Sequence, residues 1–155
     1  MAEHLDPKQR ILEWLSEAGF TTEDLPAQQN GFALKTTDLN RLAHLVTRDP
    51  AAPNLVLLQT ALDLTEQQRA AFAAIPESRR QEFFWSVRLA LLQMGAGAFG
   101  GFEVPFRRVE LRVPIYLDGL TQDNFMSRFS LLQRATLLVM AMVNRELNLQ
   151  QPWES

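Results

Sequence analysis

The sequence predicts an α+β fold, and three patterns carry this prediction. Every second residue between 109 and 117 is apolar, namely Val109, Leu111, Val113, Ile115 and Leu117. Strict alternation of this kind is typical of a strand with one buried and one solvated face. Residues 83–94 and 121–147 instead repeat apolar side chains at helical spacing. Residues 54–64 form a short apolar run between two prolines and a helix cap, which indicates a buried strand.

The composition is that of one globular domain, which we place at residues 1–155. Of the 155 residues, 46% are hydrophobic and 21% charged, so the chain can bury a core and is unlike a disordered segment. Its formal net charge of −3 argues against a general nucleic-acid binder, because such proteins usually carry a basic stripe. We therefore expect no nucleic-acid partner.

The chain has no cysteine, which excludes disulfides, thiolate nucleophiles and cysteine-based metal centres. It contains no run of about 18 uncharged apolar residues, the length that a membrane-spanning helix needs. Residues 1–20 are acidic and amphipathic and lack the apolar core of a signal peptide. We therefore expect a cytoplasmic protein that does not cross a membrane.

The first predicted helix begins at Asp6-Pro7, because aspartate caps helices and proline is tolerated at the first helical position. Its apolar stripe precedes Gly19 and consists of Ile11, Leu12, Trp14, Leu15 and Ala18. We interpret residues 20–31 as a loop, with turn signals at Pro26 and at Asn30-Gly31.

The sequence pattern of residues 38–47 is consistent with two structures, a helix and a hairpin. Leu42, Leu45 and Val46 fit the spacing of a helix, towards which propensity alone leans slightly. Leu42, His44 and Val46 also alternate as in a strand, which fits a hairpin with its turn at the start of the segment.

Two helices are expected after the buried strand. Thr65-Glu66-Gln67-Gln68 matches a capping box, which predicts a short helix to about Ala74. Pro76 then begins a second helix that Gly95 ends. One broad apolar face of this second helix consists of Phe83, Phe84, Val87, Leu91 and Met94.

The final helix begins at Thr121 and carries two apolar stripes. The main face is wide enough to dock on a sheet and consists of Phe125, Phe129, Leu132, Thr136, Val139, Met140, Val143 and Leu147. A second stripe, Leu131, Leu138 and Met142, lies well away from the first. Because a helix that only covers a sheet does not need this stripe, we predict that these three residues contact a partner.

Two blocks of the sequence resemble a known group of proteins: "RRQEFFWSVRLALLQM" at 79–94 and "VPIYLDGLTQDNFMSRFSLLQRATLLVMAMVNREL" at 113–147. They resemble an uncharacterised family of archaeal and bacterial proteins, a domain-of-unknown-function group, which is similar to the type III secretion chaperone and YbjN-like fold. The resemblance is close over about half of the chain and follows element order elsewhere. The first sixty residues match in pattern alone.

The resemblance implies a five-stranded antiparallel sheet with helices packed on one face, in the order α-β-β-β-α-β-β-α. It implies strands at 32–37 and 41–47, and on that ground we choose the hairpin over the helix. It also implies a homodimer, a chaperone-like role and no catalytic motif.

No catalytic, cofactor or metal site is predicted. The run Gly95-Ala-Gly97-Ala-Phe-Gly100 spells G-x-G-x-x-G, but dinucleotide binding needs a strand before it and a helix after it, and here the order is reversed. His4 and His44 are the only histidines, too few for a catalytic zinc site, and we expect His44 on the surface or half-buried on a strand. Ser127 and Ser130 lie inside a helix without a nucleophile elbow.

Asp118 has a chemical and a structural interpretation. It could act as a general acid if Glu103 or Glu110 lay beside it in an apolar pocket. A bend from strand to helix, made by Asp118-Gly119 and followed by a cap at Thr121, explains more. We interpret the segment as that bend.

The aromatic residues Trp14, Trp85, Phe83 and Phe84 could stack nucleic-acid bases, but stacking platforms need a positive groove, so we assign them to the core. Trp153 is expected to cover a hydrophobic edge or a neighbouring subunit.

We predict a non-enzymatic protein-binding module that acts as a homodimer and contacts its partner through Leu131, Leu138 and Met142. Methionine adapts well to partners of varied shape. The alternative is a small-ligand sensor or enzyme with a pocket between sheet and helices, lined by Tyr116, Asp118 and Glu110.

Overall fold

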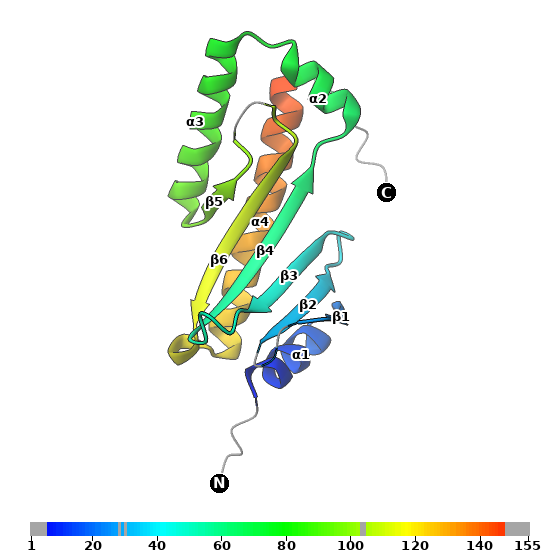
Figure 1. Cartoon of the computed structure of the whole chain (residues 1–155), viewed down its shortest axis with the longest axis vertical. Coiled ribbons are helices and arrows are strands. Elements are labelled where there is room, and N and C mark those ends of the chain that lie inside the picture. The colour runs from blue at the N-terminus through cyan, green and yellow to red at the C-terminus, as the bar shows by residue number, and fades with distance from the viewer. Residues whose placement is uncertain (1–5, 28, 30, 103–104, 148–155) are drawn as a thin grey trace. The chain divides into compact units, whose positions relative to one another are not determined.

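The computed structural model describes residues 6–27, 29, 31–102 and 105–147, and Figure 1 shows the course of the chain. In chain order the elements are α1 (Pro7–Glu17), β1 (Thr21–Leu25), β2 (Phe32–Thr37), β3 (Ala43–Arg48), β4 (Leu55–Asp63), α2 (Glu66–Ala73), α3 (Glu77–Met94), β5 (Gly97–Gly100), β6 (Arg108–Tyr116), the short 3-10 helix η1 (Leu117–Gly119) and α4 (Gln122–Leu147). No helix in these ranges is both long enough and apolar enough to cross a bilayer.

The predicted α+β class is confirmed, and the strands of the described ranges form one sheet in the order β1-β2-β3-β4-β6-β5. The first three neighbouring pairs are antiparallel, with Thr22 opposite Thr36, Leu34 opposite Val46 and Val46 opposite Leu58. The sheet has six strands where we predicted five.

The additional strand β1 lies in the segment that we predicted to be a loop. Its sequence is Thr-Thr-Glu-Asp-Leu, and none of its side chains is buried. An edge strand of polar residues leaves no alternation in the sequence, and charged side chains there protect an open edge from pairing with other chains. The loop prediction for residues 21–25 is therefore wrong for a reason that sequence pattern could not reveal.

The open question at residues 38–47 is answered by a hairpin. Strands β2 and β3 pair along their full length, from Phe32 opposite Arg48 to Thr37 opposite Ala43. The turn between them is fixed by Asp38, whose Oδ1 accepts hydrogen bonds from the amides of Asn40 and Leu42 at 2.8 and 3.0 Å. An aspartate that bonds the backbone of the following residues is a usual way to set a tight turn.

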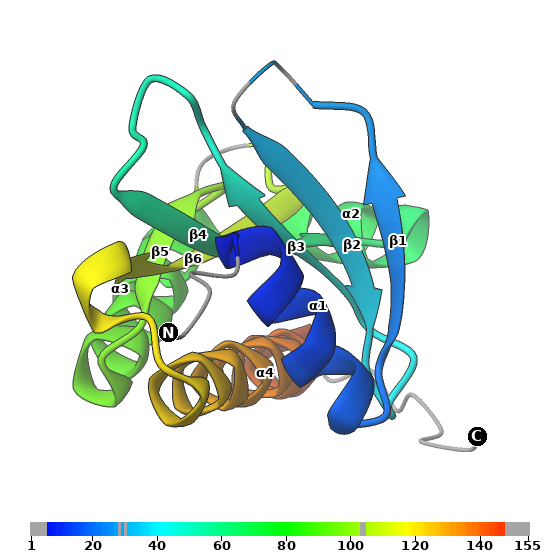
Figure 2. The same ribbon diagram turned by 90° about the horizontal axis from the view of Figure 1, so that it is seen from below.

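The chain forms two compact units, and β4, β6 and α4 each contribute residues to both. The first unit comprises the residues up to Thr60 together with Arg112–Ser130. Its core contains α1, the hairpin and the first turns of α4, and Figure 2 shows this part of the chain from below. Trp14 meets Phe125 with ring centroids 5.6 Å apart, and Phe20 meets Phe129 at 5.2 Å.

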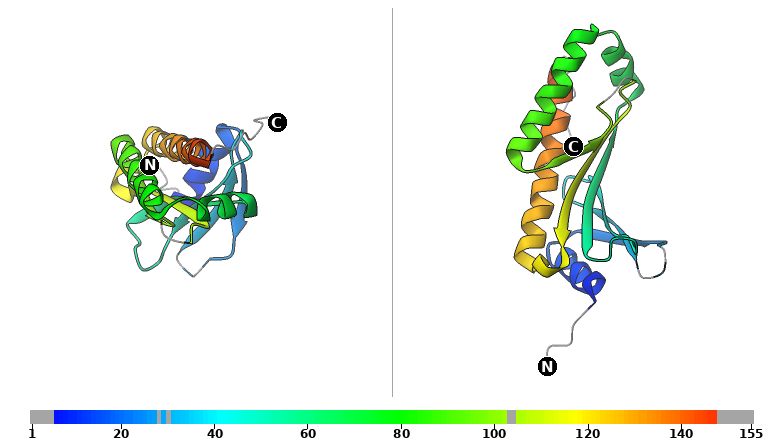
Figure 3. Two further views of the ribbon diagram at one scale, coloured as in Figure 1. Left: turned by 90° about the horizontal axis from the view of Figure 1, so that it is seen from above. Right: turned by 60° about the vertical axis from the view of Figure 1, so that its left-hand side comes forward.

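The second unit comprises Ala61–Leu111 and the residues from Leu131 onward. Helix α3 lies beside the C-terminal half of α4 in this unit, as Figures 1 and 3 both show. Its core is a cluster of aromatic rings whose neighbouring centroids lie 4.7 to 6.2 Å apart. The members of this aromatic core are Phe72, Phe83, Phe84, Phe102 and Phe106.

The predicted helix boundaries in the second unit are confirmed. Thr65 Oγ1 accepts from the Gln68 amide at 3.1 Å, and Gln68 Oε1 accepts from the Thr65 amide at 2.9 Å, which completes the capping box. Pro76 is the residue before α3, and Gly95 ends it in the left-handed conformation with φ of 83°. Strand β6 buries every second residue, Val109, Leu111, Val113 and Ile115, as predicted.

Substituting Gly101 by alanine is expected to destabilise the chain much more than substituting Gly95. Both glycines have positive φ, but a Cβ at Gly101 would overlap the carbonyl oxygen of Arg108, whereas a Cβ at Gly95 would meet nothing within 4 Å. Gly95→Ala should cost about 1 kcal/mol from backbone strain alone, and Gly101→Ala more than about 3 kcal/mol. Urea denaturation measures both, and equal losses for the two variants would contradict the close approach at Gly101.

Candidate functional site

The main apolar face of α4 is buried as predicted. Phe125, Phe129, Leu132, Thr136, Val139 and Val143 are all in the core, while Met140 and Leu147 are half-buried. Thr136 satisfies its hydroxyl within the helix by donating to the Leu132 carbonyl at 2.7 Å. This face of α4 therefore has little left to offer a partner.

The second stripe of α4 is more buried than the sequence suggested. Leu131 is only 8% exposed, and Leu138 and Met142 are half-buried. A side chain as buried as Leu131 presents almost no surface to another molecule. Of the three predicted contact residues, Leu138 and Met142 keep some exposed surface.

Helix α3 explains the burial on this flank of α4. Arg79 of α3 pairs with Glu146 of α4 at 2.8 Å. Between the two helices, Met142 lines a shallow cavity together with Phe83 and Ser86. The flank that appeared unused in the sequence is thus largely occupied by a second helix of the same unit.

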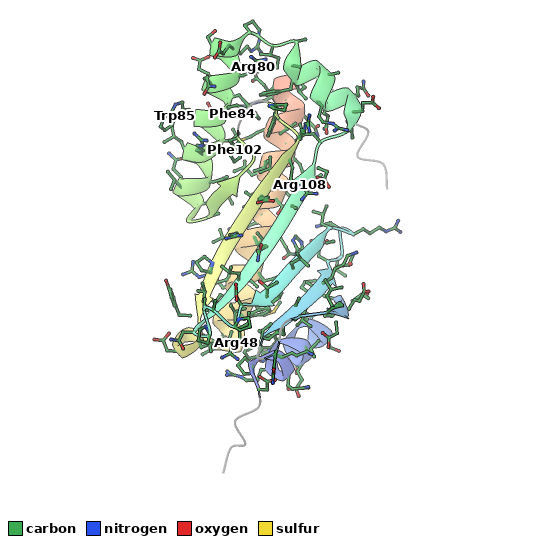
Figure 4. The ribbon with its side chains drawn as sticks, viewed as in Figure 1. Arg48, Arg80, Phe84, Trp85, Phe102 and Arg108 are labelled. Atoms are coloured by element: carbon green, nitrogen blue, oxygen red, sulfur yellow. The ribbon has the colours of Figure 1, made fainter. Side chains whose placement is uncertain are left out.

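Leu39, Leu45 and Tyr116 are exposed at separate places, whereas three exposed large apolar side chains lie together on the outer side of α3. Trp85 is 61% exposed, Leu89 52% and Leu92 70%. Their spacing of four and three residues places them on one line along the helix. Figure 4 shows Trp85 on the outer side of α3, with Phe84 and Phe102 on its inner side. We call Trp85, Leu89 and Leu92 the α3 stripe.

Arg88 is next to the α3 stripe on the helix, but its charged group is bound to Phe102 of the same chain. Its Nη2 donates to the Phe102 carbonyl at 3.3 Å, and its guanidinium carbon lies 5.7 Å from the centre of the Phe102 ring. Both contacts hold the cation against its own chain. The α3 stripe therefore presents three apolar side chains with the nearest basic group already engaged.

The α3 stripe was not predicted from the sequence, and the assignment of Trp85 to the core was wrong. Trp14, Phe83 and Phe84 were correctly assigned, since all three are buried. Helix α3 carries apolar residues on several sides, so the sequence alone does not show which side faces the core. The signal that could have found the stripe is the second set at i, i+4 and i+7, beside the set around Phe84.

A buried polar cluster in the first unit links the hairpin to β4. His44 lies between Asp38 and Thr60, with Nε2 2.8 Å from Asp38 Oδ2 and Nδ1 2.5 Å from Thr60 Oγ1. Since a carboxylate can only accept, Nε2 carries the proton, and in the neutral ring Nδ1 accepts from the Thr60 hydroxyl. His44 is 1% exposed, and the edge of its ring meets Phe129 at 5.2 Å. The expectation that His44 lies on the surface or half-buried is therefore wrong.

The order hydroxyl, imidazole, carboxylate is the one that activates a nucleophile in hydrolases. Here all three side chains are buried, so a substrate has no access to the Thr60 oxygen. Asp38 also accepts two amides of the turn, which commits it to the hairpin. The cluster satisfies buried polar groups and fixes the position of the hairpin against β4.

The other motifs that we considered show no catalytic arrangement. Gly95 ends α3 and residues 97–100 form β5, so the G-x-G-x-x-G run joins a helix to a strand as expected. Asp118 is exposed in η1, and Thr121 Oγ1 accepts from the Asn124 amide at 3.2 Å, as a cap does. His4, Glu103 and Trp153 lie outside the described residues.

The side chains proposed for the alternative pocket differ in exposure. Tyr116 and Asp118 are exposed and Glu110 is half-buried. Nowhere in the described ranges do three or more His, Cys, Asp or Glu side chains gather closely enough to hold a metal ion.

Replacing Thr60 by valine is expected to cost about 1–3 kcal/mol of unfolding free energy. The substitution keeps the shape of the side chain but leaves the buried Nδ1 of His44 without a donor. Thr37→Val is the matched control, because Thr37 is half-buried on the neighbouring hairpin, and it should change stability by no more than about 0.5 kcal/mol. Equal effects of the two substitutions in urea denaturation would show that the cluster contributes nothing to stability.

Comparison with known proteins gives a family and a fold. Residues 7–143 match the family described as "Uncharacterized conserved protein (DUF2299)". A solved structure, the crystal structure of an uncharacterized protein from Methanothermobacter thermautotrophicus, is 23% identical and superposes with a TM-score of 0.82. The alignment covers 92% of this chain and 99% of that one. No curated protein matches.

Proposed function

We propose, for a chain that belongs to the DUF2299 family of uncharacterized conserved proteins, that its function is non-enzymatic protein binding and that it acts as a homodimer through the α3 stripe. The observation that carries this proposal is the exposure of Trp85, Leu89 and Leu92 on one line of one helix. Apolar side chains scattered singly on a surface are ordinary, but a contiguous set is a usual feature of protein interfaces.

The size of the stripe sets the strength of the interaction. Full burial of an aromatic or aliphatic side chain yields about 1.5–3 kcal/mol. Because half to two thirds of each side chain is exposed, covering the α3 stripe yields roughly 3–4 kcal/mol per copy. Association costs about 4–15 kcal/mol in lost motion. Two copies together gain roughly 6–8 kcal/mol, so at the lowest association cost the stripe alone supports a weak, reversible dimer with a dissociation constant of about millimolar.

A second copy of the chain is the partner that the pattern fits. Trp85, Leu89 and Leu92 are all apolar, so the α3 stripe presents an apolar side chain at each of its three positions in either direction along the helix. In an antiparallel pair of α3 helices related by a two-fold axis near Leu89, Trp85 of each copy faces Leu92 of the other. An interface in which the same patch serves both partners is the usual form of a symmetric dimer.

A chaperone-like role and the type III secretion chaperone fold belong to the same proposal. A reversible dimer releases its apolar surface when a client helix competes for it, so the α3 stripe would then bind an amphipathic helix in the same way. Leu138 and Met142, half-buried on α4, supply adaptable surface in this scheme. The proposed setting is the cytoplasm.

Light scattering after size-exclusion chromatography tests the proposed dimer. Wild type should change from monomer to dimer as its concentration rises into the millimolar range, and Leu89→Glu should remain monomeric because it places a charge in the centre of the apolar stripe. We expect Leu89→Glu to weaken association by at least about a hundredfold, or 2.7 kcal/mol, since a carboxylate must then be desolvated.

Gln67→Glu is the matched control for this experiment. It adds the same charge to an exposed residue of helix α2, away from the α3 stripe. We expect it to dimerise as wild type does. A wild type that stays monomeric to millimolar concentration, or a control that loses association as fully as Leu89→Glu, would contradict the proposal.

The alternative of a small-ligand sensor has one observation in its favour. A cavity of about 170 Å³ lies in the second unit between the strand ends of β4 and β6 and the C-terminal half of α4. Its apolar lining includes Leu62, Val109 and Val139, and a hydrogen bond of 3.3 Å from Gln68 Nε2 to Asn144 Oδ1 lies at its polar end. The volume is below the usual range for small-molecule sites, about 300–1,000 Å³, so we rank this function second.

A further inference from the structure

A second cavity in the second unit has an unusual set of charges. Its volume is about 350 Å³, and α2, the start of α3 and the segment before β6 line it. Three arginines, Arg69, Arg80 and Arg107, lie around it, and Glu66 is the one acidic residue of its lining within the described ranges. The local surplus is therefore two positive charges, in a chain whose net charge is −3.

Among the described residues none of these three arginines forms an ion pair with a carboxylate, although, after Arg108, the charge of Arg69 contributes to lowering the pKa of the Asp63 carboxyl. The ion pairs found among the described residues in this unit are those of Arg79 with Glu146 and of Arg108 with Asp63. Arg108 donates two hydrogen bonds to Asp63, at 2.6 and 3.3 Å, and they hold the pKa of the Asp63 carboxyl below its usual value. The amide of Leu64 donates to the Arg107 carbonyl at 2.9 Å, and the carboxylate of the preceding residue, Asp63, is thus already engaged by Arg108.

Arg80 carries an unsatisfied donor beside the cavity. Its Nη1 donates to the Ala73 carbonyl at 3.2 Å, which anchors the guanidinium against the end of α2. Its Nε is buried and has no hydrogen-bond partner in the described structure. A buried N–H without an acceptor is unfavourable, and a rotation of the guanidinium that turns Nε towards the cavity would let a ligand oxygen satisfy it. Arg80, in the first turns of α3, is labelled in Figure 4.

The same cavity has an apolar floor. Phe72 and Phe106 line it with their ring centroids 4.7 Å apart, and both are buried in the aromatic core. Pro105 and Ala73 add further apolar surface at its edge. A ligand that matches the whole cavity therefore needs an oxyanion for the arginines and a small apolar group for the exposed apolar lining.

We infer that this cavity binds a small organic phosphate monoester, with the phosphate on Arg69, Arg80 and Arg107 and the organic group on the exposed apolar lining, Ala70, Ala73 and Pro105. A phosphate monoester carries nearly two negative charges at neutral pH, which matches the surplus of two. Guanidinium groups bind phosphate through paired, charge-assisted hydrogen bonds. The volume lies within the usual range for small-molecule sites.

Titration of the full chain with phenyl phosphate, followed by two-dimensional amide NMR, tests the inference. We expect shifts concentrated in α2 and at Phe106 and Arg107, with saturation in the millimolar range or below. Arg80→Gln and Arg107→Gln should each weaken binding by about tenfold, because each removes a charged donor from the phosphate. Arg134→Gln is the control, since it removes the same charge from an exposed position on α4 outside the cavity, and its binding should equal that of wild type.

Three further ligands separate the contributions of charge and apolar contact. Benzoate carries one negative charge, phenol none, and inorganic phosphate lacks the ring, so all three should bind more weakly than phenyl phosphate. The inference is overturned if shifts are absent from α2 and from Phe106 and Arg107. It is equally overturned if Arg80→Gln and Arg107→Gln bind like Arg134→Gln, or if inorganic phosphate or benzoate binds as tightly as phenyl phosphate.

Discussion

The apolar residues of helix α3 face two directions at once, and this constraint shapes the second unit. Phe84 and Leu91 belong to the core, whereas Trp85, Leu89 and Leu92 are exposed. The inner side of the helix faces the C-terminal half of α4, where Arg79 pairs with Glu146 and Phe83 lines a cavity with Met142. Helix α3 packs beside α4 but leaves its own α3 stripe exposed. The hydrophobic effect favours a partner molecule that covers the α3 stripe. The proposed dimer follows from this exposed surface.

Sequence pattern predicted the parts of the fold whose causes are local. The capping box at Thr65 involves residues three apart, and the alternation in β6 and the main face of α4 depend on repeats within one element. Strand β1 was missed because its polar sequence is set by its place at the sheet edge. The exposure of Trp85 was missed because a helix with apolar residues on several sides does not show which side is inward.

The polar sites illustrate the same limit more sharply. Alternation placed His44 on a strand, but its partners Asp38 and Thr60 lie six residues before and 16 residues after it, and their meeting depends on the register of the sheet. The arginine cavity likewise draws Arg69 and Arg107 from segments far apart in sequence. A protein of negative net charge gives no overall sign of such a local surplus. The His44 cluster and the arginine cavity can both be recognised once the three-dimensional positions of the strands and helices are known.

Directed cross-linking tests the α3 interface most directly, because the chain has no cysteine and one introduced thiol is unique. A disulfide needs Cα atoms about 4.4–6.8 Å apart, a separation reached in an antiparallel pair near the two-fold axis. Under mild oxidation, Leu89→Cys should give a covalent dimer. Ser78→Cys should stay monomeric, since eleven residues along the helix, roughly 16 Å, take it far from the axis. Equal yields of covalent dimer from the two variants, or none from Leu89→Cys, would contradict the account.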